Sequence, residues 1–420
     1  MKKANLVLTA ALAAAGLVGV VGGALTPTTV MAAAAKKPSL SASVMKPLKA
    51  AQEAMNAKNW DEALTHIQEA QKVDGRTAFD DFQINDFLWF VLYQKKQLAE
   101  SAVALEAAVN SGFVPPESLN QRYKLLLQLN LMGQNFPKAV EWGNKYIATN
   151  PTDMEASLQL AQGMYFNKDY AGAKALAEKM VATGAKPSED TLKLLLRCNV
   201  ELRNDAGSLN TLELLVRHYP AQKYWEDLLN NQLFRTRDDR ALRQLYRLMV
   251  DTNTLDKGDE FSEMGNLLIT GGYPAEAKKV LEQGMAMSVF SGDAKNRAQG
   301  DLDRARNLAA TDAKDVPNAE KLIAAAKTGN SIIATGKLLF SAGEYARAAD
   351  AVKQGLAKGG VTDADDANML LGIALFRSGK PADAAAAFGA VKDPKMTEVA
   401  RMWKLKLESD AANAAAPAAG

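Results

Sequence analysis

The chain has a single cysteine and two histidines among its 420 residues. One cysteine cannot form an internal disulfide, and a zinc site built from two or four cysteines is excluded with it. His66 and His218 leave little from which to build a histidine-based metal or catalytic site. The 50 Lys and Arg residues nearly balance the 48 Asp and Glu residues, so the net charge gives no electrostatic signature of nucleic-acid binding.

One acidic segment resembles a metal-binding loop but lacks the residues that such a loop needs. Residues 363–366 read Asp-Ala-Asp-Asp, like the start of a calcium loop, but Asn368 replaces the required glycine and Ala374 replaces the glutamate. We expect Thr362 and Asp363 to cap a helix instead. No triad or paired-carboxylate pattern is present, so we predict no catalytic residue, no metal site, no cofactor and no enzymatic activity.

Reactive side chains elsewhere have simpler interpretations. Cys198 ends the apolar run 194–198 and is expected to be a small buried residue. His66 and His218 are expected at the surface or at helix ends. A basic cluster also contains Asp238 and Asp239, which favours a solvated turn and helix face, with a docking patch for an acidic partner or a lipid headgroup as the alternative. Its members are Arg235, Arg237, Arg240, Arg243 and Arg247.

The N-terminal segment has the pattern of a secretory signal peptide. A positive start, Met1-Lys2-Lys3, precedes an uncharged run of apolar and small residues at 6–25. Val30 and Ala32 fit the −3 and −1 positions of a cleavage site, so we expect residues 1–32 to be removed after Ala32. The alternative is a retained anchor, because the run is about 20 residues long. No cysteine lies near the cut, so we expect a periplasmic protein that is not a lipoprotein and has no stable transmembrane segment once cleaved.

The rest of the chain repeats with a period of about 35 residues. The segments 264–281, 335–352 and 371–388 each contain a small residue, then a glycine, an alanine and a large apolar residue at matching positions. The same repeat spacing extends upstream, and the unit around Asn307 matches it least well. We call the position of the first, usually small residue of each unit the anchor. The anchors are Ala51, Trp89, Leu127, Ala161, Leu196, Leu229, Gly265, Asn307, Gly336 and Gly372.

This spacing has a physical explanation in pairs of antiparallel helices. Small residues at the anchor and at positions such as Ala348 let two helix backbones approach closely. Gly133, Gly272, Gly343 and Gly379 are expected to end the first helix of a pair with a positive φ. One pair cannot bury its apolar face alone, so successive pairs must stack into a solenoid.

The pattern of small residue, alanine and large apolar residue resembles that of tetratricopeptide repeat (TPR) proteins. The resemblance implies an all-α fold, a solenoid of about ten helix-turn-helix units that forms a right-handed superhelix. We predict a linker at 33–44, the repeat array at 45–408 and a disordered Ala-rich tail at 409–420. Within the array we expect a flexion point at 203–208, where an ordinary turn is replaced, and a weak helix pair or long loop at 288–316.

In TPR arrays the first helix of each unit lines the concave groove, so the resemblance points to a partner-binding surface. Amides and cations form one predicted row, and apolar and aromatic side chains form another beside it. Amides can bond the backbone of an extended peptide, and aromatic residues can anchor it; the alternative is that the aromatic row belongs to the core. The predicted groove residues are Phe90, Tyr93, Gln128, Gln162, Tyr165, Phe166, Arg197, Asn230, Phe234, Asn266, Lys337 and Phe340.

Segments such as 219–228, 271–277 and 370–376 make the chain similar to periplasmic TPR proteins associated with TonB–ExbB–ExbD systems of Gram-negative bacteria. This similarity implies a non-enzymatic scaffold accessory to outer-membrane uptake. Its partner would be an envelope protein or peptide segment, such as a TonB-system component, and no nucleic acid is expected. Two alternatives stay open: a scaffold for envelope or secretion-complex assembly, and a carrier of a lipid or apolar ligand in the groove.

The repeat assignment makes a direct prediction about Ala348. A leucine at this position should overpack the contact between two helices and cost about 1–3 kcal/mol of unfolding free energy. Chemical denaturation of the Ala348→Leu variant measures this cost. An unchanged unfolding midpoint would refute the assignment.

Overall fold

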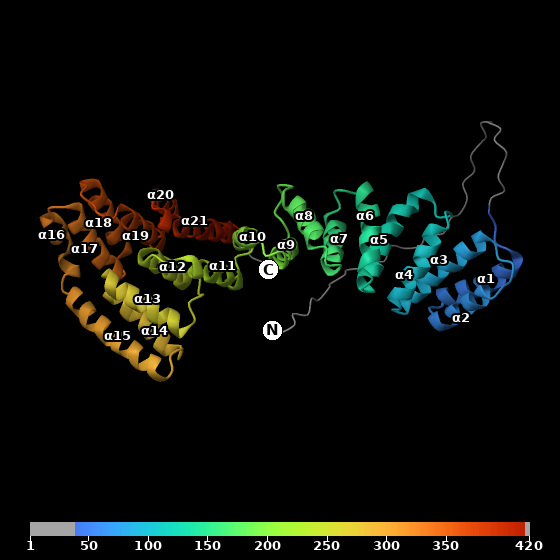
Figure 1. The fold of residues 1–420 in the computed structure, drawn as a ribbon, viewed down its shortest axis with the longest axis horizontal. Coiled ribbons are helices and arrows are strands. Elements are labelled where there is room, and N and C mark those ends of the chain that lie inside the picture. Colours follow the sequence, from blue (N-terminus) through green and yellow to red (C-terminus); the bar gives the residue numbers. More distant parts are fainter. Residues whose placement is uncertain (1–37, 416–420) are drawn as a thin grey trace, which may run out of the picture.

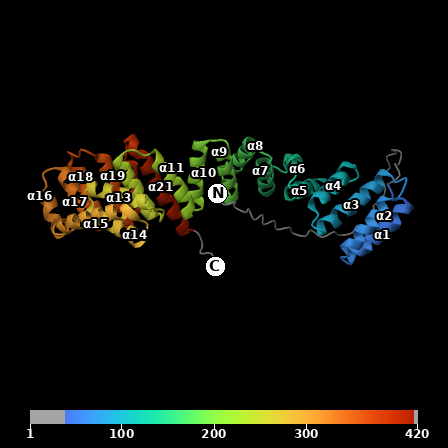
Figure 2. The ribbon, with the colours of Figure 1, turned by 60° about the horizontal axis from the view of Figure 1, so that its bottom comes forward.

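The computed structural model describes residues 38–415 as helices joined by short turns, and this range contains no strand. The expected signal peptide lies outside these residues. No helix within the described range is both long and apolar enough to cross a membrane. The molecule is an elongated, curved array, with α1 at one end and α16 at the other (Figures 1 and 2).

Helix pairs build the array, and each pair follows the last along the chain. The helices of the N-terminal half are α1 (Ala42–Asn56), α2 (Trp60–Gln71), α3 (Ala78–Gln94), α4 (Leu98–Asn110), α5 (Pro116–Met132), α6 (Phe136–Thr149), α7 (Met154–Phe166), α8 (Tyr170–Val181), α9 (Glu189–Glu201) and α10 (Asp205–His218). The C-terminal half contains α11 (Gln222–Arg235), α12 (Asp239–Asp251), α13 (Gly258–Gly271), α14 (Pro274–Ala286), α15 (Gly292–Asp312), the 3₁₀ turn η1 (Val316–Asn318), α16 (Ala319–Ala325), α17 (Gly329–Ser341), α18 (Tyr345–Lys358), α19 (Ala364–Arg377), α20 (Pro381–Gly389) and α21 (Pro394–Ala415).

The predicted helical solenoid is confirmed. Outside α15 and α16, each first helix packs against the second helix of its own pair, and each second helix packs against the next helix of the chain. The small anchor residues let these helices approach, because a Cβ added to Gly336 would lie 2.7 Å from Cγ2 of Val352. A Cβ at Gly372 would collide with the ring of Phe388 in the same way. Ala348 is completely buried, as the spacing predicts.

The prediction for residues 288–316 is wrong, because this stretch is neither a helix pair nor a loop. It contains the single long helix α15, which packs on α13 and α14 through Ala298, Leu302 and Ala305. These three residues form a narrow apolar stripe at helical spacing on a polar, Ala-rich helix. The anchor Asn307 is exposed, so the repeat frame does not hold in this unit.

The turns within the N-terminal pairs use a residue other than glycine in the left-handed conformation. Lys58, Lys96, Gln134, Lys168 and Arg203 occupy equivalent places, with φ between 52° and 65°. The expectation for Gly133 is wrong, because its φ is −79° and the neighbouring Gln134 takes the positive φ. Arg203 matches its counterparts, so the turn at 203–208 has ordinary geometry, and the flexion expected there stays a prediction. In the C-terminal half, Gly272, Gly343 and Gly379 have the expected positive φ.

The ends of the array extend further than predicted. Helix α1 begins at Ala42, inside the predicted linker, and Val44 is fully buried. Helix α21 continues to Ala415, so the predicted disordered tail does not begin at 409. Ser409 is buried, and Lys406 Nζ pairs with Asp410 on the same helix.

The two halves differ in what fills their concave side. In the C-terminal half, α12 lies between α13 and α19, with α21 alongside (Figure 1). Every residue from Ala241 to Met249 is buried, although this helix is rich in arginine. One face of α12 is apolar, and the opposite face carries Arg240, Arg243 and Arg247, which meet carboxylates from distant segments.

Ion pairs connect the polar face of α12 to the helices around it. Arg243 Nη2 and Gln244 Nε2 donate to Asp366 Oδ1 of α19 at 2.8 and 3.0 Å. Arg247, which has no exposed surface, donates to Glu276 of α14 through Nε at 3.0 Å and Nη2 at 2.6 Å. Arg377 of α19 then pairs with Glu276 at 3.4 Å and with Asp251 of α12 at 3.1 Å.

Glu276 and Asp366 favour the ionised form despite their burial, whereas burial raises the pKa of Asp251. Burial alone would raise the pKa of Glu276 and of Asp366, because it penalises the charged form. Arg247 and Arg377 outweigh that effect at Glu276, and Arg243, Lys337 and Arg247 do so at Asp366, so both pKa values lie below their ordinary range. The network therefore holds opposite charges together within the C-terminal half.

Helix α21 closes this half against α10 and α12. Trp403 Nε1 donates to the backbone oxygen of Gln244 at 3.0 Å, and the Trp403 ring stacks on Phe388 at 5.7 Å between ring centroids. Arg401 pairs with Glu213 of α10, and Arg217 of α10 pairs with Glu408 at 3.1 Å. The last helix thereby fastens the end of the array to its middle.

The α12 network makes Arg247 a sensitive position. We expect Arg247→Met to lower the free energy of unfolding by about 3–5 kcal/mol, because it leaves the Glu276 carboxylate buried without its bidentate partner. The matched control is Arg306→Met, which removes a surface pair with Glu282 at 3.0 Å and should cost less than about 1 kcal/mol. Urea denaturation followed by circular dichroism compares the two. Equal midpoints for the two variants would contradict a structural role for the buried pair.

Candidate functional site

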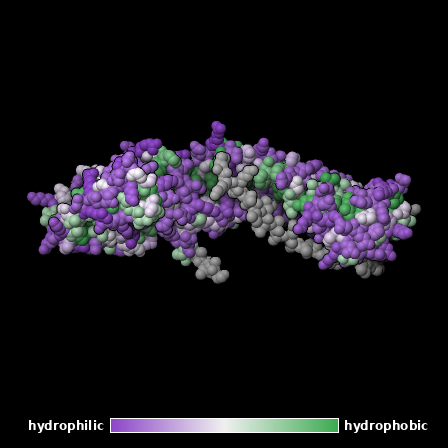
Figure 3. Space-filling view, turned by 90° about the horizontal axis from the view of Figure 1, so that it is seen from below, coloured by the Kyte–Doolittle hydropathy of each residue, from purple (hydrophilic) through white to green (hydrophobic). Residues whose placement is uncertain are grey.

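The first helices of the N-terminal half form the inner row of the array. Helix α1 contacts α3, α5 contacts α7, and α7 contacts α9, so these helices approach one another directly across the intervening second helices. A curved stack brings its inner helices closest together, and the exposed faces of α3, α5, α7 and α9 therefore line its inner surface. Hydrophobic surface gathers over the N-terminal half in Figure 3.

The structure separates the twelve predicted groove residues into three groups by exposure. Phe166, Phe234 and Asn266 are exposed and Phe340 is buried; the half-buried residues are Phe90, Tyr93, Gln128, Gln162, Tyr165, Arg197, Asn230 and Lys337. Half-burial suits a binding residue, because the side chain is positioned by its neighbours and still has a free surface.

The polar row runs along α5, α7 and α9. Gln128 Nε2 donates to Gln159 Oε1 at 3.4 Å, a long bond at the limit of hydrogen-bonding distance. Within the described residues, the side chains of Gln162 and Arg197 make no hydrogen bond or ion pair. Their amide and guanidinium groups therefore remain available to a partner.

An aromatic cluster lies at the end of α7 beside this row. Phe166 stacks on Phe136 of α6 at 5.1 Å between centroids, and Tyr165 packs edge-on against Phe166 at 5.6 Å and tilted against Tyr170 of α8 at 5.3 Å. Phe166 keeps 40% of its surface exposed. Burial and the nearby carboxylate of Glu201 raise the pKa of Tyr165, so its hydroxyl stays protonated. The cluster is a fixed apolar platform with a hydrogen-bonding edge.

Phe90 and Tyr93 belong more to the packing of the array than to a free surface. Phe90 makes edge contacts with Trp60 at 6.0 Å and with Trp89 at 5.7 Å. Tyr93 packs against the apolar cluster that contains Phe82 and Leu105. The contacts of Phe90 and Tyr93 therefore favour the alternative that the aromatic row belongs to the core.

Two predicted groove residues of the C-terminal half face the chain's own helix α12. Phe340 is 1% exposed and lies under Arg247, whose guanidinium carbon is 4.6 Å from the ring centroid. Lys337 Nζ pairs with Asp366 at 3.4 Å. Including Phe340 in a partner-binding surface is therefore wrong, because α12 occupies the position that a partner would need.

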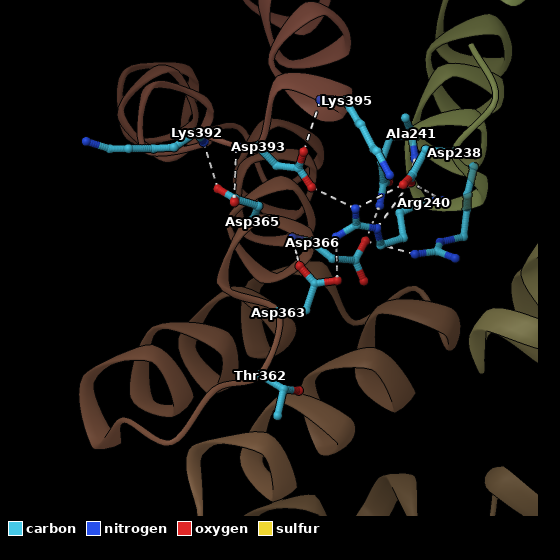
Figure 4. A network of polar contacts seen from close by, with 12 residues as sticks. Asp238, Arg240, Ala241, Thr362, Asp363, Asp365, Asp366, Lys392, Asp393 and Lys395 are labelled. Atoms are coloured by element: carbon cyan, nitrogen blue, oxygen red, sulfur yellow. Dashed lines mark hydrogen bonds and ion pairs between the residues drawn. The ribbon is translucent and has the colours of Figure 1, made fainter.

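The basic cluster is divided into a buried and an exposed part. Arg243 and Arg247 are buried in the α12 network, and Arg240 pairs with Asp238, Asp363 and Asp393 (Figure 4). Asp363, Asp366 and Asp393 lie more than 100 residues after the arginines with which they pair. Glu276 lies 29 residues after its partner Arg247. Arg235 and Arg237 are exposed and are the members of the cluster that a partner could reach.

The remaining single residues have structural roles. Asp363 caps α19 by accepting a hydrogen bond from the Asp366 backbone nitrogen at 2.9 Å, as a cap and not as a calcium ligand. Cys198 is fully buried, and burial raises the pKa of its thiol to about 11. Among the described residues, no group of three or more His, Cys, Asp or Glu side chains is placed to hold a metal ion.

Comparison with known protein families identifies a repeat in the C-terminal half. Residues 333–396, from α17 to the start of α21, match the family model described as the tetratricopeptide repeat. No curated relative matches the chain.

Two solved structures are similar over most of the chain. A crystal structure of a tetratricopeptide repeat protein from Parabacteroides merdae is 12% identical and aligns over 80% of this chain and 100% of its own, with a TM-score of 0.32. The structure of Naa15/Naa10 bound to HypK-THB is 16% identical and aligns over 90% of this chain and 64% of that chain, with a TM-score of 0.42. Both scores are low, so the assignment depends on the matched repeat and on the observed packing of the helix pairs. On those two findings, residues 333–396 carry tetratricopeptide repeats, and the described chain as a whole is a solenoid of packed helix pairs.

Proposed function

We propose that this protein is a non-enzymatic scaffold of the periplasm whose open inner surface, from α3 to α11, binds an extended segment of an envelope protein. The observation that carries this proposal is the pair Gln162 and Arg197, which lie half-buried on the inner helices with no partner among the described residues. Beside them, the Tyr165–Phe166 cluster offers an apolar anchor. Such a surface can bond the backbone of a peptide and hold one large side chain.

The periplasmic location rests on the sequence pattern of residues 1–32. The finer assignment, a scaffold accessory to TonB-dependent uptake, rests on the similarity of segments 219–228, 271–277 and 370–376. A scaffold for another envelope or secretion complex would use the same surface, and the identity of the partner distinguishes the two.

The carrier alternative has less support from the cavities. The larger of two described clefts, about 660 Å³, is lined mostly by charged side chains. The second, about 270 Å³, is too small for a lipid acyl chain with its headgroup. Neither of these two clefts offers a lipid an apolar enclosure large enough to hold it.

Site-specific photocrosslinking in the periplasm tests the proposal. A photoreactive amino acid at Gln162 should capture an envelope protein, and the same amino acid at Lys179, exposed on the second helix α8, should not. Recovery of a TonB–ExbB–ExbD component would support the finer assignment. No envelope protein at Gln162, or the same proteins at both positions, would contradict the proposal.

A second variant separates binding from folding. Alanine at Gln128, Gln162, Arg197 and Asn230 together should abolish capture of the partner by the purified protein, because it removes the polar row and the amide of Asn230 on α11. The helical circular dichroism signal should be unchanged, since none of the four side chains is fully buried. Retained binding in this variant would refute the assignment of the polar row.

A further inference from the structure

A second recess lies away from the inner surface of the N-terminal half. It is a cleft of about 660 Å³ between the connection from α11 to α12 and the first turn of α21. Residues 235–240 line one wall, and Pro394, Lys395 and Glu398 line the other. Figure 4 shows this corner, where the starts of α12, α19 and α21 meet.

Several charges of the cleft are already neutralised. Arg240 donates to Asp238, and beyond the cleft to Asp363 at 2.9 Å and Asp393 at 2.7 Å. Glu398 pairs with Arg401 on the same helix. These groups fix the walls of the cleft relative to each other and have little charge left for a ligand.

Two cations of the cleft have no carboxylate partner among the described residues, and a third makes only a long, exposed ion pair. Arg237 donates to the backbone oxygen of Thr236 at 3.0 Å, and within the described residues neither Arg237 nor Lys395 has a carboxylate partner. Arg235 approaches Asp205 at 3.9 Å, and Asp205 is itself largely exposed. Among the carboxylates that line the cleft, Asp239 has no partner within the described residues. The free charge of the cleft is therefore positive.

An apolar side chain adjoins these cations in the sequence. Phe234 is 77% exposed and immediately precedes Arg235 at the end of α11. Water contact with so much of a phenyl ring is unfavourable, and a large exposed apolar side chain next to free cations is typical of a docking surface.

We propose that this cleft binds an acidic segment of a partner protein, with Arg235, Arg237 and Lys395 pairing with its carboxylates. Arginine presents a planar fork that matches a carboxylate. A peptide suits the site better than a membrane does, because the free cations lie in a recess between two elements, which a protein segment can enter and a flat lipid surface cannot. The proposal concerns a surface other than the polar row of α5–α9, and it does not depend on the function proposed above.

Binding of a fluorescein-labelled pentaglutamate peptide to the purified full chain, measured by fluorescence anisotropy, tests the site. We expect the affinity to fall as sodium chloride is raised, because salt screens the pairs. The triple variant Arg235→Gln, Arg237→Gln and Lys395→Gln should bind at least about tenfold more weakly, because it removes the three cations that pair with the carboxylates of the peptide.

The matched control removes the same charge elsewhere. Lys72→Gln, Lys279→Gln and Lys321→Gln lie at exposed positions outside the cleft and should leave the affinity unchanged. Equal weakening in both triple variants, or no binding by the unaltered protein, would overturn the proposal. Equal competition by inorganic phosphate or by phosphatidylglycerol vesicles would also overturn it, in favour of a general anion site or a membrane site.

Reversal of one charge provides a second variant. Arg237→Glu should weaken pentaglutamate binding more than Arg237→Gln does, because it places a carboxylate against the peptide. Both variants should keep the thermal midpoint of the unaltered protein, since Arg237 is exposed and lies outside the α12 network. Equal affinity of the two variants would contradict direct contact between Arg237 and the peptide.

Discussion

The buried guanidinium of Arg247 sets the arrangement of the C-terminal half. It meets Glu276 in a bidentate pair and lies over the rings of Tyr273 and Phe340, at 4.2 and 4.6 Å from their centroids. A charge can be buried at this depth only if its partners are held in place around it. The helices from α13 to α21 must therefore wrap around α12 for the network to be complete, and this wrapping fills the concave side with the chain's own residues.

As a consequence, the two halves of one continuous array differ in whether their inner surface is open. The C-terminal half is closed, with α12 buried on its concave side and α21 fastened across α10 and α12. Among the described residues, no helix fills the N-terminal half in this way, so Gln162, Arg197 and the cluster around Phe166 stay open on its inner surface. A rigid closed half joined to an open one suits a scaffold that holds one partner on its inner surface. The basic cleft at the α11–α12 connection provides a second contact near the junction of the halves.

Local chemistry made much of the fold predictable from the sequence. Small residues such as Gly336 and Gly372 lie where helices nearly touch, and their spacing reveals the repeat. The turns were less predictable, because Gln134 takes the left-handed conformation beside a glycine that does not need it. Arg243 and Arg247 could not be assigned, since charged residues at helical spacing also describe a solvated face. Their burial depends on Asp366 and Glu276, and pairing over such sequence distances leaves no local signal.

Hydrogen–deuterium exchange of the full chain tests most directly whether α12 is the enclosed centre of the C-terminal half. The account predicts that the amides of residues 241–249 exchange among the slowest in the protein, because they open only when the surrounding helices separate. Helix α15, with three buried residues on one side, provides the comparison within the same half and should exchange faster. Exchange of α12 as rapid as that of α15 would contradict the account.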